Sequence, residues 1–257
     1  MENRIVIVSA SKMREVARTA LKNHWKEMFL GMFIYYIFSG VIPSILDLFF
    51  TATRYMELVT GEYISMDVTY ASPVYDFILS GPLLLGFLMF LLAFFRKHTV
   101  EYALTLEGFS MFGKGFLLYL MYSIRIFLWS LLFIIPGFIA AFRYSQAFFL
   151  RIDHPEWTTS QCIQASCYLM KGNKAKLFGV YLSFIGWYIL AMIPGSFMSM
   201  FFTNEVALLI VAMISSIPVL FVDLYMYMTE TVFYELLTGN LVIQERSPFE
   251  QFNEDKF

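Results

Sequence analysis

The chain has 257 residues, of which 59% are hydrophobic, 19% aromatic and 15% charged. Soluble domains average roughly 45–50% apolar and 25% charged residues, so a water-soluble core could not bury this apolar excess. The net charge of −2 excludes the basic surface that nucleic-acid binding requires. The composition therefore predicts an integral membrane protein with no nucleic-acid partner.

Residues 1–27 contain a helical pattern before the first long apolar run. Apolar residues between Met13 and Leu21 recur at helical spacing, and a row of basic residues occupies the opposite face. Such rows attract anionic lipid by about 1 kcal/mol per residue near a membrane surface. We expect a cytoplasmic amphipathic helix on the membrane surface, which either anchors the topology or senses lipid. The basic row consists of Arg14, Arg18, Lys22 and Lys26.

Six apolar segments follow, and each is predicted to cross the membrane as a helix. A hydrocarbon core about 30 Å thick needs roughly 20 residues in a helix. The segment at 138–152 is shorter, about 22 Å long as a helix, so it either spans obliquely or turns back. The predicted spans are residues 28–50, 74–95, 115–135, 138–152, 177–193 and 206–229.

The distribution of basic residues favours six crossings. With the N-terminus inside, all of the 18 Lys and Arg residues except Arg54, Arg125 and Arg143 lie on the cytoplasmic side. We therefore predict an all-α bundle, with its membrane domain at 28–237. Both termini are expected in the cytoplasm, and residues 238–257 are expected to form a polar tail.

An internal pattern suggests three units, each a surface helix followed by a hairpin. Residues 158–176 repeat the apolar stripe with basic residues, and residues 100–114 do so more weakly. The first limb of each hairpin is predicted to end in an Ile-Pro pair, although Ile217-Pro218 inside the last span shows that such a pair also occurs outside this pattern. Proline kinks or ends any helix because it lacks the N–H donor. The three pairs are Ile42-Pro43, Ile135-Pro136 and Ile193-Pro194, and the second basic row is Lys171, Lys174 and Lys176.

An ordered set of motifs lies between residues 129 and 187. In order and spacing it closely resembles the bacterial integral membrane family catalogued as domain of unknown function 975. The resemblance implies a multi-pass protein of the bacterial inner or plasma membrane, and it brings no assigned activity and no catalytic residue. The motifs are Trp129-Ser-Leu-Leu-Phe-Ile-Ile-Pro-Gly137, Tyr144, Asp153-His-Pro155, Ser166, Met170-Lys-Gly-Asn-Lys174 and Leu182-Ser-Phe-Ile-Gly-Trp187.

Four charged residues within the predicted spans form a candidate intramembrane polar site. Arg125 lies near mid-membrane, where a cation costs roughly 2.5–3.5 kcal/mol, so it should face protein or water. The functional interpretation is a polar pathway, and the alternative is a set of buried ion pairs that fix helix register. We expect Arg125 to pair with Asp223. The four residues are Arg125, Arg143, Asp223 and Asp47.

No motif predicts catalysis or a cofactor. The sequence lacks a phosphate-binding glycine loop, a zinc-peptidase helix and a nucleophile elbow. His154, between Asp153 and Glu156, is better explained by a turn at Pro155 than by a metal site. We therefore expect a non-enzymatic membrane module that organises lipid or partner proteins. The alternative is a small transporter or permease of unknown substrate, which a continuous polar cavity at mid-membrane would favour.

Overall fold

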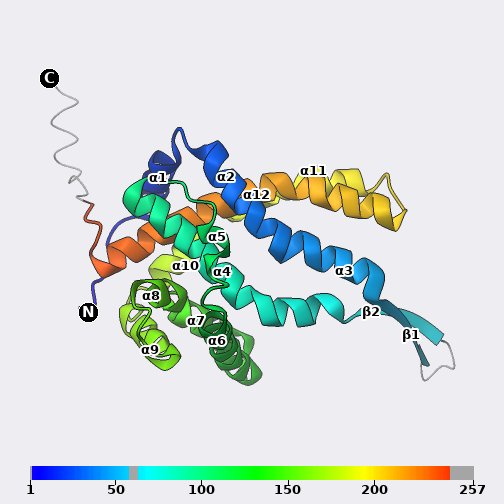
Figure 1. The fold of residues 1–257 in the computed structure, drawn as a ribbon, viewed down its shortest axis with the longest axis horizontal. Coiled ribbons are helices and arrows are strands. Elements are labelled where there is room, and N and C mark those ends of the chain that lie inside the picture. Colours follow the sequence, from blue (N-terminus) through cyan, green and yellow to red (C-terminus); the bar gives the residue numbers. More distant parts are fainter. Residues whose placement is uncertain (1, 58–62, 244–257) are drawn as a thin grey trace.

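The computed structural model describes residues 2–57 and 63–243. Within them the chain is almost entirely helical, and the strands form one two-stranded sheet. Figure 1 shows three helical hairpins that extend from a common end. We call this end the base, and it contains α1, α5, α8, α9 and the last turns of α4 and α12. The predicted all-α helical bundle is thus confirmed.

The first hairpin has two long limbs joined at the tip by the two-stranded sheet (Figure 1). Pro43 lies inside the first limb rather than at its end, directly after a π-helical turn. Proline has no backbone N–H to donate, and a π-helical turn changes the hydrogen-bonding pattern of the helix locally beside it. The elements are α1 (Ala10–Leu21), α2 (Trp25–Tyr36), η1 (Ile37–Val41), α3 (Ile42–Phe50), β1 (Thr51–Glu57), β2 (Tyr63–Thr69) and α4 (Ala71–Lys97).

The second hairpin diverges from the other two (Figure 1). Its limbs meet at Phe133, whose extended backbone separates α6 from α7 just before the Ile135-Pro136 pair. The segment predicted as one span at 138–152 is divided between α7 and α8, with a turn at Ser145 and Gln146. The elements are α5 (Leu104–Glu107), α6 (Phe112–Leu132), α7 (Ile134–Tyr144) and α8 (Ala147–Asp153).

The third hairpin follows helix α9, which begins with a capping box between Thr158 and Gln161. Pro194 lies within α11, so here too the Ile-Pro pair does not end the limb. The last helix is capped at its start by Asn204 and at its end by Gly239, whose φ of 80° suits glycine. The elements are α9 (Thr159–Leu169), α10 (Lys174–Leu182), α11 (Ile185–Ser199) and α12 (Glu205–Thr238).

Five helical segments among the described residues are long and apolar enough to cross a membrane. Residues 138–152 are not among them, so a sixth crossing stays a prediction. The last segment extends well past its predicted end at residue 229, and its later acidic residues Glu230 and Glu235 accept hydrogen bonds within the protein. The five segments are Trp25–Phe50, Ala71–Lys97, Phe112–Leu132, Lys174–Ser199 and Val206–Thr238.

Buried residues concentrate in the base, whereas the arms expose apolar side chains. Phe90, Phe94 and Phe233 are fully buried in the core. At the arm tips, by contrast, Phe133 is 75% exposed and Met200 is 80% exposed. Apolar surface of this extent requires an apolar solvent or partner around the arms.

The central helix α4 packs closely on the second hairpin through glycines. A Cβ atom on Gly81 would overlap the carbonyl oxygen of Gly115 in α6, and one on Gly108 would overlap the carbonyl oxygen of Pro82. Small residues allow backbones to approach closely where helices cross within membranes. These contacts hold the second hairpin against the first at the middle of α4.

Both ends of the described chain lie at the base (Figure 1). The apolar face of α1, with Met13, Ala17 and Leu21, is fully buried, and α1 packs against α12. After α12, the Leu241 N–H donates to the Glu235 carbonyl at 3.0 Å. The predicted tail at 238–257 therefore begins within the packed base, and its residues 244–257 lie outside the described part of the chain.

Candidate functional site

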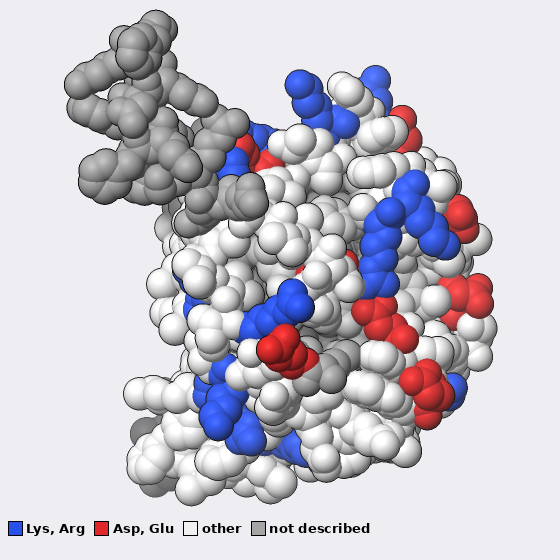
Figure 2. All heavy atoms as spheres, turned by 90° about the vertical axis from the view of Figure 1, so that its left-hand side faces the viewer, with Lys and Arg blue, Asp and Glu red and all other residues white. Residues whose placement is uncertain are grey.

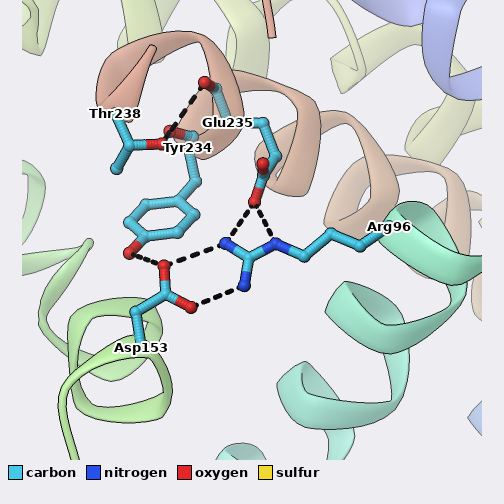
Figure 3. A network of polar contacts seen from close by, with 5 residues as sticks. All are labelled: Arg96, Asp153, Tyr234, Glu235 and Thr238. Atoms are coloured by element: carbon cyan, nitrogen blue, oxygen red, sulfur yellow. Dashed lines mark hydrogen bonds and ion pairs between the residues drawn. The ribbon is translucent and has the colours of Figure 1, made fainter. Parts of the chain in front are cut away.

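A network of charged side chains joins the three hairpins at the base (Figure 3). The Arg96 guanidinium, at the end of α4, donates two parallel hydrogen bonds of 2.6 and 2.9 Å to Asp153 of α8. It also donates from Nη2 at 2.6 Å and from Nε at 2.9 Å to Glu235 Oε1 in α12. The Tyr234 hydroxyl completes the network by donating to Asp153 at 2.7 Å.

This network has a structural role that the sequence interpretation of Asp153 missed. Burial opposes ionisation of Asp153, but hydrogen bonds from Arg96 and Tyr234 outweigh it and hold the pKa of its carboxyl below the usual value. The Glu235 side chain is only 3% exposed and has its charge compensated by Arg96. The arginine therefore lets two acidic groups from different hairpins lie together inside the base.

A second set of hydrogen bonds, which we call the Asn173 clasp, holds the N-terminal segment before α1 to the third hairpin. The fully buried Asn173 side chain accepts from the Val6 N–H at 2.8 Å and donates to the Arg4 carbonyl, also at 2.8 Å. This pair of bonds imitates the pairing of one strand with another. Asn173 also donates to Leu169 O at 2.8 Å, and Lys176 Nζ donates to Ile7 O at 3.0 Å.

The predicted basic rows therefore have divided roles. Lys176 holds the N-terminal segment, and the Lys171 carbonyl accepts from Asn3 at 3.1 Å. Lys22 and Lys26 are exposed near the base. Figure 2 views this end of the molecule and shows Lys and Arg side chains interspersed with Asp and Glu side chains.

Arg14 and Arg18 line a cavity of about 300 Å³ that we call the arginine pocket. Arg14 Nη1 donates to Ser183 O at 3.2 Å, and the Arg14 backbone carbonyl accepts from the Tyr225 hydroxyl at 2.9 Å. Its Nε is buried and lacks a hydrogen-bond partner among the described residues. The remaining lining residues are Ser11, Glu15, Trp187 and Tyr225.

An apolar groove of about 350 Å³, which we call the aromatic groove, adjoins the arginine pocket. The two share Trp187 and Tyr225 as lining residues, so they form one continuous surface. Phe221 in the groove precedes Tyr225 by about one helical turn on α12, which places the groove on the side of the arm tips. Its lining is Trp25, Trp187, Phe221, Val222 and Tyr225.

A second apolar groove lies between α7 and α10 and has a volume of about 660 Å³. Phe138, Phe142 and Phe178 provide much of its wall, and Lys174 supplies a cation at the start of α10. This combination of an apolar groove with a basic residue resembles the combination of the aromatic groove with the arginine pocket. Lys174 from the second predicted row thus lines a groove rather than the Asn173 clasp.

The four residues of the predicted intramembrane polar site do not form ion pairs with one another within the described chain. Asp223 accepts from the Tyr188 hydroxyl, and Asp47 accepts from the Ser72 N–H at 3.1 Å. Arg125 Nη1 is buried without a hydrogen-bond partner. The expected pair of Arg125 with Asp223 is therefore wrong, and the partner of Asp223 is Tyr188 on the neighbouring limb of the same hairpin.

Arg143, the fourth predicted member, is exposed on α7 and lies 5.9 Å from the centre of the Tyr144 ring. The acidic residue that the sequence interpretation missed is Glu230, which is 6% exposed in the last turns of α12. Its position after the predicted end of the last span made it look like an ordinary interfacial charge. Only the folded arrangement shows that it faces the inside of the base.

The helical hairpins with apolar arms define a multi-pass helical membrane protein. A family model described as "Protein of unknown function (DUF975)" matches residues 131–241. This is the family that the sequence motifs resemble, so the resemblance is confirmed over a segment from the end of α6 past the end of α12. No curated protein and no solved structure matches the chain. The kind of membrane and the side that holds the termini stay predictions.

Proposed function

We propose that this protein is a non-enzymatic membrane module that binds anionic phospholipid at its base and organises lipid around its arms. The observation that carries the proposal is the continuity between the arginine pocket and the aromatic groove. A phospholipid has the same two parts in the same order, an anionic phosphate followed by apolar chains. Binding at this site requires no catalytic group.

The charges of the arginine pocket favour an anionic head group. Arg14 and Arg18 form no ion pair within the described chain, whereas Glu15 is paired with Lys12 at 3.0 Å. Contact between Glu15 and Lys12 leaves the two arginines as the uncompensated charges of the pocket. Guanidinium groups match the geometry of phosphate oxygens, and the buried Arg14 Nε offers an unused donor.

The aromatic groove favours an acyl chain as the occupant of the second part. Its lining presents ring faces and a valine, and it lies further from the base than the arginine pocket. Aromatic side chains such as Trp25 and Trp187 are typical of the boundary between head groups and hydrocarbon. A lipid bound here would have its phosphate towards the base and its chain along α12.

The alternative of a small transporter has less support. None of the four residues Arg125, Arg143, Asp223 and Asp47 lines the arginine pocket or either apolar groove, so these cavities give no sign of a shared polar pathway. The α7–α10 groove, with Lys174 beside an apolar channel, adds a second surface suited to lipid. An interaction with other membrane proteins, which the sequence also suggested, stays a prediction.

The test is native mass spectrometry of the full chain released from nanodiscs that contain phosphatidylglycerol, phosphatidylcholine or both. We expect retained phosphatidylglycerol, and we expect Arg14→Gln combined with Arg18→Gln to lower its retention several-fold. Lys97→Gln, which removes an exposed cation elsewhere at the base, is the matched control. Equal retention by the double variant and the control, or no preference for the anionic lipid, would reject the proposal.

A second pair of variants tests the acyl part of the site. Phe221→Ala opens the groove beside Trp25, whereas Phe197→Ala removes an exposed ring from the arm helix α11 away from the groove. We expect only Phe221→Ala to weaken lipid retention. If both variants act alike, the bound lipid belongs to the general boundary layer and not to this site.

A further inference from the structure

A separate cavity of about 170 Å³ lies inside the base, where helices of all three hairpins meet. It shares no lining residue with the arginine pocket or with either apolar groove. Its apolar wall is formed by Leu and Phe side chains of α4 and α8. Its polar lining consists of Tyr119, Tyr122, Ser145, Tyr181, Tyr227 and Glu230.

Glu230 is the only ionisable acid in this lining, and its partners are neutral. Tyr181 donates its hydroxyl to Glu230 Oε2 at 2.9 Å, and Gln146 Nε2 lies 3.4 Å from Oε1. Within the described chain, no Lys, Arg or His lies within ion-pair distance of Glu230. A buried carboxylate without a counter-ion is costly, so such groups are usually paired with a cation or neutralised.

The cavity offers more acceptors than donors. The hydroxyls of Tyr119, Tyr122 and Tyr227 make no hydrogen bond to the described part of the chain, so their oxygens are open to a ligand. Gln146, whose amide contacts Glu230, is not a lining residue, but its buried Oε1 atom also has no partner in the described chain. A ligand rich in N–H donors would satisfy this shell, whereas an anion would be repelled by Glu230.

Such a ligand beside Glu230 would be a cation, and the size and walls of the cavity indicate which class of cation fits. A buried water occupies about 10–15 Å³ on this measure, so the volume greatly exceeds what one bare metal ion fills. The faces of tyrosine rings attract organic cations. A primary ammonium combines three N–H donors with a positive charge and an apolar stem.

We propose that this cavity binds a small primary ammonium ion, with Glu230 as its counter-ion and the tyrosine hydroxyls as further acceptors. The site lies apart from the proposed phospholipid phosphate site, so the two proposals can fail independently. A free amine and the head group of phosphatidylethanolamine present the same chemistry. The experiment therefore has one arm for each source.

In the first arm, ethanolamine hydrochloride is titrated into the full chain in detergent by calorimetry, with sodium chloride as the background salt. We expect saturable binding at one site, weakened at least about tenfold by Glu230→Gln, since hydrogen bonds to charged groups are roughly twice as strong as neutral ones. Glu101→Gln, which neutralises an exposed acid near α5, should bind like the unmodified chain. Tyr227→Phe keeps the charge and should weaken binding less than Glu230→Gln.

In the second arm, the thermal unfolding of the same proteins is compared in nanodiscs with and without phosphatidylethanolamine. If this lipid stabilises the unmodified chain but not Glu230→Gln, the head group is the source of the ammonium. This holds even if free ethanolamine binds too weakly to detect. Binding of free ethanolamine without a lipid effect identifies a soluble amine. The proposal is overturned if neither ethanolamine binding nor the lipid effect depends on Glu230. It is also overturned if sodium competes with ethanolamine at equal concentration.

Discussion

Arg96 and Asp153 form two parallel hydrogen bonds across the junction between the first and second hairpins. The pair is separated by 57 residues in the sequence, and its geometry is bidentate. Glu235 of the third hairpin shares the same guanidinium. One side chain thus connects three structural units whose arms diverge.

Replacing Arg96 should loosen the base. Arg96→Ala leaves Asp153 and the buried Glu235 without a cation, and removing one partner of a fully buried pair costs about 3–5 kcal/mol. Because the Arg96 side chain is 33% exposed, we expect a smaller loss, about 1–3 kcal/mol. Unfolding by sodium dodecyl sulfate in mixed micelles measures it. Lys97→Ala is the control, and equal stability of the two variants would contradict the role assigned to Arg96.

Asp153 should make the stability of the base depend on pH. Its folded-state pKa lies below the ordinary value of 3.8, so its contribution is fully present above about pH 4 and is lost as the pH falls through the folded-state pKa. We expect the unfolding midpoint of the native chain to fall in acid more steeply than that of Asp153→Asn. Thermal unfolding between pH 7 and pH 3 compares the two, and parallel curves would refute the prediction.

Asn173→Ala should release the N-terminal segment. The substitution removes the bonds to Val6, Arg4 and Leu169, at a cost of about 1–3 kcal/mol for the buried groups left unpaired. Hydrogen exchange of the Val6 amide should become faster while exchange within α4 stays slow. Gln164→Ala, an exposed amide on α9, serves as the control. Unchanged exchange at Val6 would show that other contacts hold the segment.

Gly108→Ala should push α5 away from α4, whereas Gly113→Ala should leave the helices in place. A Cβ on Gly108 meets the Pro82 carbonyl, and overpacking of this kind costs about 1–3 kcal/mol. A Cβ on Gly113 in α6 meets nothing within 4 Å, so that substitution should be neutral or mildly stabilising. Thermal unfolding in detergent distinguishes the pair. Equal midpoints would mean that α4 and α5 shift apart without cost.

The long apolar helices could be predicted from the sequence because span length depends on local composition. The predicted segment 74–95 lies within α4, and 28–50 lies within Trp25–Phe50. The end of α12 could not be predicted in this way. Glu230 and Glu235 look like the polar end of a span, yet each accepts a hydrogen bond from a residue far away in the sequence, Tyr181 and Arg96 respectively.

The candidate site was predictable only in part, for the same reason. The basic row that includes Arg14 and Arg18 follows from helical periodicity, which is visible in one sequence. The aromatic groove beside it requires α2, α11 and α12 to meet, and no local pattern predicts that meeting. Likewise, a charge such as Asp223 shows that a partner is needed but does not identify Tyr188 as the partner.

The Asn173 clasp also sets an order of events during synthesis of the chain. Val6 is synthesised before any of the three hairpins, but the side chain that accepts its N–H is added 167 residues later. The N-terminal segment therefore cannot dock while the first two hairpins are being inserted. Completion of the base must wait for the third hairpin, so a chain truncated before residue 173 would keep its N-terminal segment undocked.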